Sequence, residues 1–155
     1  MKCFSLLATL LFGTLFATAQ GFTAPQQRVS TVVGIASGQT ARLNIFYPSI
    51  PAPLLQVMCS VTASIVDDQG SILKTLDFQM LGGKTASLSL NADSDLPAPR
   101  SAQIHALILT PAVSSGGGYC QVLPSLDIVD NATGKTVIHL ETTLTYPVPV
   151  ALRAR

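Results

Sequence analysis

Hydrophobic and polar residues alternate along most of the chain after Arg28. In 41–47 the odd positions are apolar and most even ones are polar, and the odd positions of 57–65 again carry the apolar set. The stretch 86–91 alternates in the same way. A period of two with many β-branched residues is typical of strands that bury one face. No window of a dozen residues shows a helical stripe, so we predict an all-β fold.

Turn signals separate the alternating runs. They include the glycine pair at 82–83 and the Asx-rich and glycine-containing clusters at 67–70 and 130–134. Short strands with turns about every ten residues favour an antiparallel β-sandwich of about seven or eight strands. The pattern predicts strands at about 29–36, 40–47, 57–67, 71–81, 84–91, 102–110, 119–129 and 136–146.

One phrase occurs twice, as GQTARLNI at 38–45 and as GKTASLSL at 83–90. Each copy follows an apolar strand, and its glycine permits the positive φ that a tight hairpin turn needs. Two copies fall short of the three or so that solenoids need, so the repeat reflects folding geometry. With this hairpin the chain resembles the immunoglobulin-like sandwich modules of secreted bacterial proteins over about 28–146. The resemblance implies a fold type and no activity.

The N-terminal residues have the features of an export signal. Lys2 precedes an uncharged apolar run at 4–16, and small residues follow it. We predict a secretory signal peptide at 1–19, cleaved between Ala19 and Gln20, and therefore a secreted or periplasmic protein. The apolar run is shorter than a bilayer span, so no membrane span is expected after cleavage. The predicted organisation is signal peptide 1–19, flexible N-terminus 20–27, β-sandwich domain 28–146 and C-terminal tail 147–155.

Two cysteines remain once Cys3 has left with the signal peptide. Cys59 and Cys120 are expected to pair in an oxidising compartment, the alternative being two separate buried thiols. Each cysteine is in phase with the apolar residues of its own strand, so both sulfurs should point into the core. Because each lies near the start of its strand, bridging requires two strands that run parallel in facing sheets. Such a bridge would stabilise the fold by ~4 kcal/mol in the chain-entropy model.

Charge adds little to the picture. Nine Lys and Arg stand against eight Asp and Glu, and one of the nine, Lys2, is removed with the signal. A net charge near zero without a basic cluster argues against nucleic acid and anionic membranes as partners. Charged residues make up only 11% of the chain, so the surface must be rich in Ser and Thr. Such a surface lowers the barrier to self-association.

No pattern of metal ligands stands out. His105 and His139 lack a spacing that would fix two zinc ligands together. A copper site needs Cys and His in one loop, and no His follows Cys120 before His139. The oxygen ligands at alternate positions of 91–95 suggest a weak calcium site, with a solvated Asx-rich turn as the alternative. We expect neither a metal nor a cofactor.

Catalytic motifs are not evident either. The sequence contains no Gly-x-Ser-x-Gly, and neither histidine falls on a loop that would form a cleft. Asn131 opens an Asn-x-Thr glycan acceptor pattern within a predicted turn, although the turn alone explains those residues. We predict that the protein is not an enzyme.

Binding and assembly are the functions left. We expect a binding or adhesion module at the cell envelope that recognises a protein or a glycan through loops at one end of the sandwich. The alternative is a structural subunit of a surface assembly, in which the segment 145–155 or 20–27 is donated to the sheet of a neighbour. The candidate binding-loop residues are Tyr47, Pro48, Pro51, Pro53, Asp93, Asp95 and Tyr119.

Overall fold

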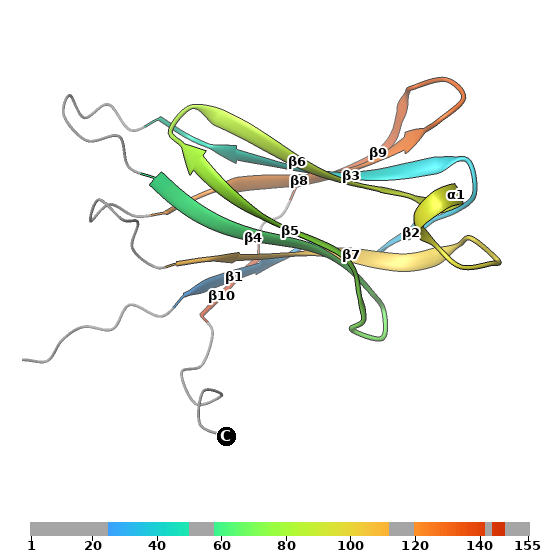
Figure 1. Ribbon diagram of the computed structural model, residues 1–155, viewed down its shortest axis with the longest axis horizontal. Coiled ribbons are helices and arrows are strands. Elements are labelled where there is room, and N and C mark those ends of the chain that lie inside the picture. The colour runs from blue at the N-terminus through green and yellow to red at the C-terminus, as the bar shows by residue number, and fades with distance from the viewer. Residues whose placement is uncertain (1–24, 50–57, 112–119, 142–143, 148–155) are drawn as a thin grey trace, which may run out of the picture.

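The chain folds into two antiparallel sheets that face each other (Figure 1), which confirms the all-β prediction. A computed structural model describes residues 25–49, 58–111, 120–141 and 144–147. Sheet A has the strand order β10-β1-β7-β4-β5, with β2 also paired to β7, and sheet B has the order β6-β3-β8-β9. The elements are β1 (Gln26–Val29), β2 (Val33–Ile35), β3 (Gln39–Tyr47), β4 (Met58–Asp67), β5 (Ile72–Leu81), β6 (Lys84–Asn91), α1 (Ala92–Asp95), β7 (Ala102–Thr110), β8 (Leu123–Asp130), β9 (Thr136–Glu141) and β10 (Leu144–Pro147).

The core lies between the sheets and is built from the apolar phase of each strand. Alternate side chains of a strand point to opposite faces, so every second residue reaches the core. On β4 the buried set starts at Cys59 and on β3 at Ala41, as the alternation predicts. The largest fully buried side chains include Leu43, Ile45, Ile65, Leu90, Ile104, Ile108, Leu126 and Ile128.

The two copies of the repeated phrase do not form hairpins, contrary to the prediction. In each copy the strand before the glycine turn lies in sheet A and the strand after it lies in sheet B. Each turn is therefore an arch that joins facing strands, and the apolar residues on both sides of it fill the same core. The second strands of the two copies, β3 and β6, pair with each other instead.

In place of the predicted strand 29–36 the chain has two short strands on the same side of β7, and β1 begins three residues earlier than predicted. β1 pairs with the later part of β7 and β2 with its start. Between them the hydroxyl of Ser30 accepts a hydrogen bond from the backbone N–H of Ala106, in the place of a ladder carbonyl. The register shifts by one residue after this point, and Val32 is left exposed.

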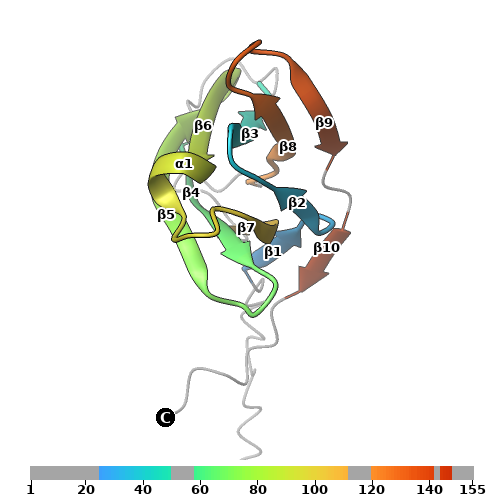
Figure 2. The same ribbon diagram turned by 90° about the vertical axis from the view of Figure 1, so that its right-hand side faces the viewer.

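The predicted strand 136–146 is also divided, here between the two sheets. β9 is an edge strand of sheet B, and β10 pairs with β1 at the edge of sheet A, where Gln26 lies opposite Pro147. The segment between the predicted strands 84–91 and 102–110 begins with the single turn of α1, capped by the side chain of Asn91. Figure 2 shows the consequence end-on: β5, β6 and α1 lie on one flank of the sandwich, and β9 and β10 lie on the other.

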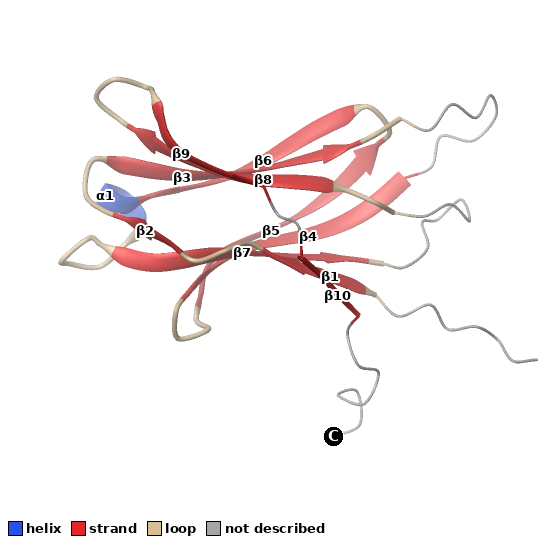
Figure 3. Cartoon of the chain, turned by 180° about the vertical axis from the view of Figure 1, so that it is seen from behind, coloured by secondary structure: helices blue, strands red, loops and turns tan. Residues whose placement is uncertain are grey.

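The two ends of the sandwich differ. At the end we call the disulfide end, β3 and β5 finish and β4, β6 and β8 begin. At the opposite end, the turn end, lie the 67–71 turn, α1 and the 130–134 turn (Figure 3). Both the start of β1 and the finish of β10 lie at the disulfide end, since Gln26 pairs with Thr110 and with Pro147.

Candidate functional site

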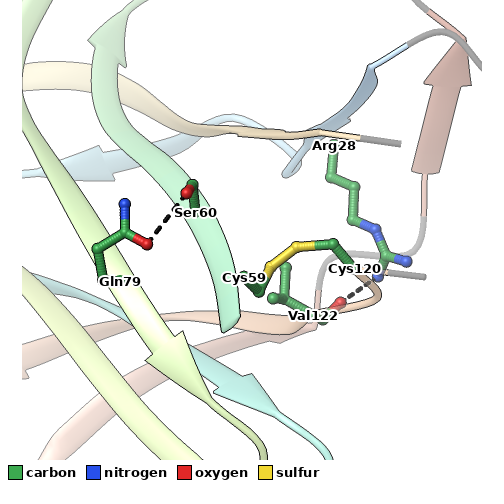
Figure 4. The surroundings of a disulfide bond; sticks show 6 residues. All are labelled: Arg28, Cys59, Ser60, Gln79, Cys120 and Val122. Carbon is green, nitrogen blue, oxygen red and sulfur yellow. Dashed lines mark hydrogen bonds between the residues drawn. A yellow bond between two sulfur atoms is a disulfide. The ribbon is translucent and has the colours of Figure 1, made fainter. Parts of the chain in front are cut away.

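A disulfide bridges the two sheets at the disulfide end. Cys59 belongs to β4, and Cys120 lies just before β8, with the two Cα atoms 5.5 Å apart. β4 and β8 run in the same direction in facing sheets, so their starts meet (Figure 4). This is the geometry that the predicted pairing required. Both cysteines are buried, at 0% and 2% exposed.

Arg28 secures the segment that follows Cys120. Its guanidinium Nη1 donates a hydrogen bond to the carbonyl oxygen of Val122, as Figure 4 shows. Partial burial lowers the pKa of Arg28 from its ordinary value, yet an arginine stays charged at neutral pH. Every Asp and Glu of the chain lies in the described ranges, and within them the ion pairs are Lys74–Asp95 and His139–Asp127. Within the described residues Arg28 is therefore not paired with an Asp or a Glu.

Two pairs of exposed apolar side chains flank the disulfide. On the outer face of sheet B, Phe46 and Leu123 lie directly opposite each other and are 40% and 56% exposed. On sheet A, Met58 and Leu81 are opposed in the same way and are 42% and 36% exposed. Single exposed apolar residues are ordinary on protein surfaces, whereas contiguous apolar patches mark interaction surfaces, which makes these opposed pairs the candidate contact residues at this end.

The sequence contained a signal for these residues. In a strand whose odd positions are buried, Phe46 is an apolar residue in the polar phase, and Leu123 and Leu81 also stand out of phase with their buried neighbours. An apolar side chain on the solvent face has no core to fill. Residues out of phase in this way therefore indicate candidate contacts more directly than loop composition does.

The candidate binding-loop residues are placed differently. Tyr47 is buried, 2% exposed, and its carbonyl oxygen accepts a hydrogen bond from the N–H of Gly83. Pro48 is half-buried beside it. Pro51, Pro53 and Tyr119 lie outside the described residues. The structure thus brings Tyr47 and Pro48 to the disulfide end, with the ring of Tyr47 packed in the core.

Asp93 and Asp95 lie at the turn end, where they bond to donors of this chain. The Asp93 carboxylate accepts hydrogen bonds from the hydroxyl of Ser37 and the N–H of Gly38, which lower its pKa. Asp95 accepts from Lys74 and from the N–H of Asn91, and these contacts lower its pKa too. These carboxylates hold the β2–β3 arch and β5 against α1.

The other ligand types are also used within the fold. Nδ1 of His139 contacts the Asp127 carboxylate, whose other oxygen accepts from the side-chain amide of Asn44, all on the outer face of sheet B. Nδ1 of His105 is buried and without a hydrogen bond. Among the described residues no serine hydroxyl bonds to either histidine, and no group of three or more His, Cys, Asp or Glu is placed to hold a metal.

Two further features of the turn end complete the survey. An open hollow of about 550 Å³ lies between the start of β7 and the β2–β3 arch, with Gln39, Asp68 and Gln103 among its lining residues. Asn131, which opens the glycan acceptor pattern, accepts a hydrogen bond from the Thr40 hydroxyl through its amide oxygen. Neither feature brings together reactive groups.

Comparisons with protein-family models, with curated proteins and with solved structures found no match to this chain. Within the described ranges, no helix has the length and apolar character needed to cross a membrane. The function therefore has to be argued from the geometry of the disulfide end.

Proposed function

We propose that the chain is an exported, non-catalytic, immunoglobulin-like β-sandwich that acts as a binding module at the cell envelope, with the disulfide end as its contact surface. The observation that carries this proposal is the opposed apolar pairs, Phe46 with Leu123 and Met58 with Leu81, on the two outer faces beside the Cys59–Cys120 bridge. An inter-sheet disulfide and the sequence features of 1–19 are compatible with export.

The disulfide end is suited to binding because its backbone is held in place. The bridge joins the two sheets there, and the Arg28 contact fixes the carbonyl of Val122 next to Leu123. A contact surface whose geometry exists before binding loses less conformational entropy when a partner docks. The turn end, in contrast, uses its carboxylates to hold its own turns together.

Binding to purified envelopes of the native host tests the proposal. Residues 20–155, which contain every described strand, are mixed with envelopes and sedimented. The substitution Leu123→Ser should reduce the bound fraction, whereas Val137→Ser, at a residue of similar exposure (53%) near the turn end, should not. If both variants bind as well as the parent, the disulfide end is not the contact surface.

A second candidate function is assembly by strand addition. β6 is an edge strand of sheet B, and its eight residues pair with β3 in one continuous register without a bulge or a proline. Regular edge strands of this kind accept a strand from a neighbour. The tail is less free to donate, because 144–147 already forms β10 against β1.

Light scattering on a sizing column separates the two functions. Assembly predicts oligomers whose mass increases with protein concentration and which the edge-blocking substitution Ser87→Lys disperses. A monomer at all concentrations would leave binding through the disulfide end as the function.

A further inference from the structure

The edge strands of the two sheets differ in how they are protected from pairing with another chain. An edge strand exposes backbone N–H and C=O groups, and proteins protect such edges with charges, bulges, prolines or short strands. Among the described strands, β5 has a register shift and an inward-phase Lys74 opposite Ile65, and β9 has a register shift and the charged Glu141. β10 ends in Pro147, and β2 has only three residues.

β6 lacks these protections over most of its length. It pairs with β3 in one continuous register, and Lys84, its first residue, is its only charged one. Residues 85–90 contain neither a charge nor a proline. On the outer face of the sheet they present the exposed hydroxyls of Thr85, Ser87 and Ser89. Among the described edges, β6 is therefore the one that is open to strand addition.

An inward-facing leucine is exposed on the same flank. Leu76 of β5 lies opposite Ala63, which is fully buried, so its side chain belongs to the core face of sheet A. It is nevertheless 47% exposed, because β5 and β6 are the outermost strands of their sheets and no described strand lies beyond them (Figure 2). A strand added to β6 would extend sheet B past this opening and cover Leu76.

We propose that β6 pairs antiparallel with β6 of a second copy of this chain, so that the two copies of sheet B become one sheet. The inference rests on the proposed assembly function and names its partner. The strand is complementary to itself. With Ser87 at the two-fold axis, Thr85 lies opposite Ser89 of the second copy, and hydroxyls face hydroxyls on the outer side. Ala86 lies opposite Leu88 of the second copy, so apolar side chains meet on the core side.

The charge of Lys84 favours the antiparallel direction. Parallel pairing would place the two Lys84 side chains next to each other, whereas antiparallel pairing moves each of them to the finish of β6 in the other copy. The charged groups at that finish are balanced. Asp95 is paired with Lys74, and Asp93 lies within the electrostatic reach of Arg100. Antiparallel pairing therefore brings no like charges of the strand together.

The pairing stops at two copies. A two-fold contact is closed, and each copy uses its open edge in the shared ladder. Because β6 begins at the disulfide end, antiparallel pairing points the two disulfide ends in opposite directions. The dimer would thus present the proposed contact surface at both of its ends and join two partners.

Light scattering over a wide concentration range tests the inference on residues 20–155 with the disulfide intact. We expect the mass to rise from one chain to two and to stay there. Ser87→Lys and Ser87→Glu should each weaken the dimer about tenfold or more, because like charges then meet at the axis. An equimolar mixture of the two variants should restore the dimer, since opposite charges meet. Ser60→Lys, at an exposed serine of the inner strand β4, adds the same charge and should behave like the parent.

The exposed leucine has its own matched control. Leu76→Ser should weaken the dimer, whereas Ile138→Ser, at an inward-facing residue of β9 on the opposite flank (38% exposed), should not.

The other outcomes separate the inference from the function on which it rests. A monomer at all concentrations would overturn both the inference and assembly, and would leave binding through the disulfide end. A mass that keeps rising beyond two chains would overturn the closed dimer and leave assembly standing. A dimer that both Ser87 variants leave unchanged, or a mixture that associates no better than either variant, would also overturn the inference.

Discussion

Leu43 and Leu88 occupy equivalent positions in the two copies of the repeated phrase, and they lie directly opposite each other on β3 and β6. The pairs on either side follow the same exchange: Ala41 faces Leu90, and Ile45 faces Ala86. The two copies are thus related by a local two-fold axis between Leu43 and Leu88. Both leucines are buried, at 0% and 4% exposed, so the axis passes through the core face of sheet B.

The first prediction concerns this leucine pair. Leu43→Ala and Leu88→Ala should each lower the free energy of unfolding by about 2–5 kcal/mol, because each leaves a cavity in a packed core. In the double variant the loss in the free energy of unfolding should differ from the sum of the two single losses, since the side chains are neighbours. Urea unfolding of the four proteins gives the coupling energy, and strict additivity would show that the two side chains do not interact.

The arch glycines give a second prediction. Gly38 and Gly83 have φ of 80° and 77°, a region that costs an ordinary L-residue about 1–3 kcal/mol. Nothing lies within 4 Å of a Cβ built at Gly38, so Gly38→Ala isolates the backbone cost and should destabilise by about that amount. Gly38→Asn should cost less, because asparagine tolerates this conformation. The measurement is the thermal unfolding midpoint, which should be highest for the parent, lower for Gly38→Asn and lowest for Gly38→Ala.

A third prediction is that the disulfide contributes much of the stability. Replacing both cysteines with Ala should lower the free energy of unfolding by about 2–5 kcal/mol, because the unfolded chain regains the freedom of a long loop. Denaturant unfolding of the parent with and without a reductant gives the same comparison without a substitution. An unchanged midpoint in both experiments would contradict this account of the disulfide end.

The fourth prediction concerns acid stability. Hydrogen bonds lower the pKa of Asp93, Asp95 and Asp130 in the folded state, so the unfolded chain binds protons first as the pH falls. Their contribution is therefore present above the ordinary pKa of Asp, about 4, and is lost as the pH falls through the lower folded values. Denaturant midpoints measured from neutral pH downward should decline below about pH 4.

Asp93→Asn tests the cause of that decline. The variant should be less stable than the parent at neutral pH, and its midpoint should depend less on pH in the acid range. Asp68→Asn removes the same charge from the neighbouring turn and serves as the control for net charge. A decline of equal size in the Asp93 variant and the parent would show that Asp93 does not contribute.

The sequence was sufficient to find the strands but not their assignment to sheets. The alternation of apolar and polar residues shows which side chains of a strand are buried. Because both sheets face the same core, it does not show to which sheet the strand belongs. The residues around Gly38 and Gly83 therefore look alike in a hairpin and in an arch. For the same reason the segment 136–146 read as one strand, although its two halves pair in different sheets. The Ser30 contact that divides 29–36 depends on β7, which is distant in the sequence.

The candidate site was predictable in part. The phase of Cys59 and Cys120 indicated that both point inward, and sheet assignment then explained why their strand starts meet. Loop composition directed attention to Asp93 and Asp95, whose carboxylates bond within the fold. The opposed position of Phe46 and Leu123 arises only from the register of β3 and β8, which no local pattern encodes.

The pairing of β1 with β10 has a practical consequence. Since Gln26 lies opposite Pro147, the start of β1 and the finish of β10 are within a few ångströms of each other, and a short glycine-serine linker would span the gap. A circularly permuted gene could therefore join these positions and open the chain at the 67–70 turn, whose Gly70 has open space around it. Such a permutant would keep every strand pair and the disulfide while moving both free termini to the opposite end of the molecule.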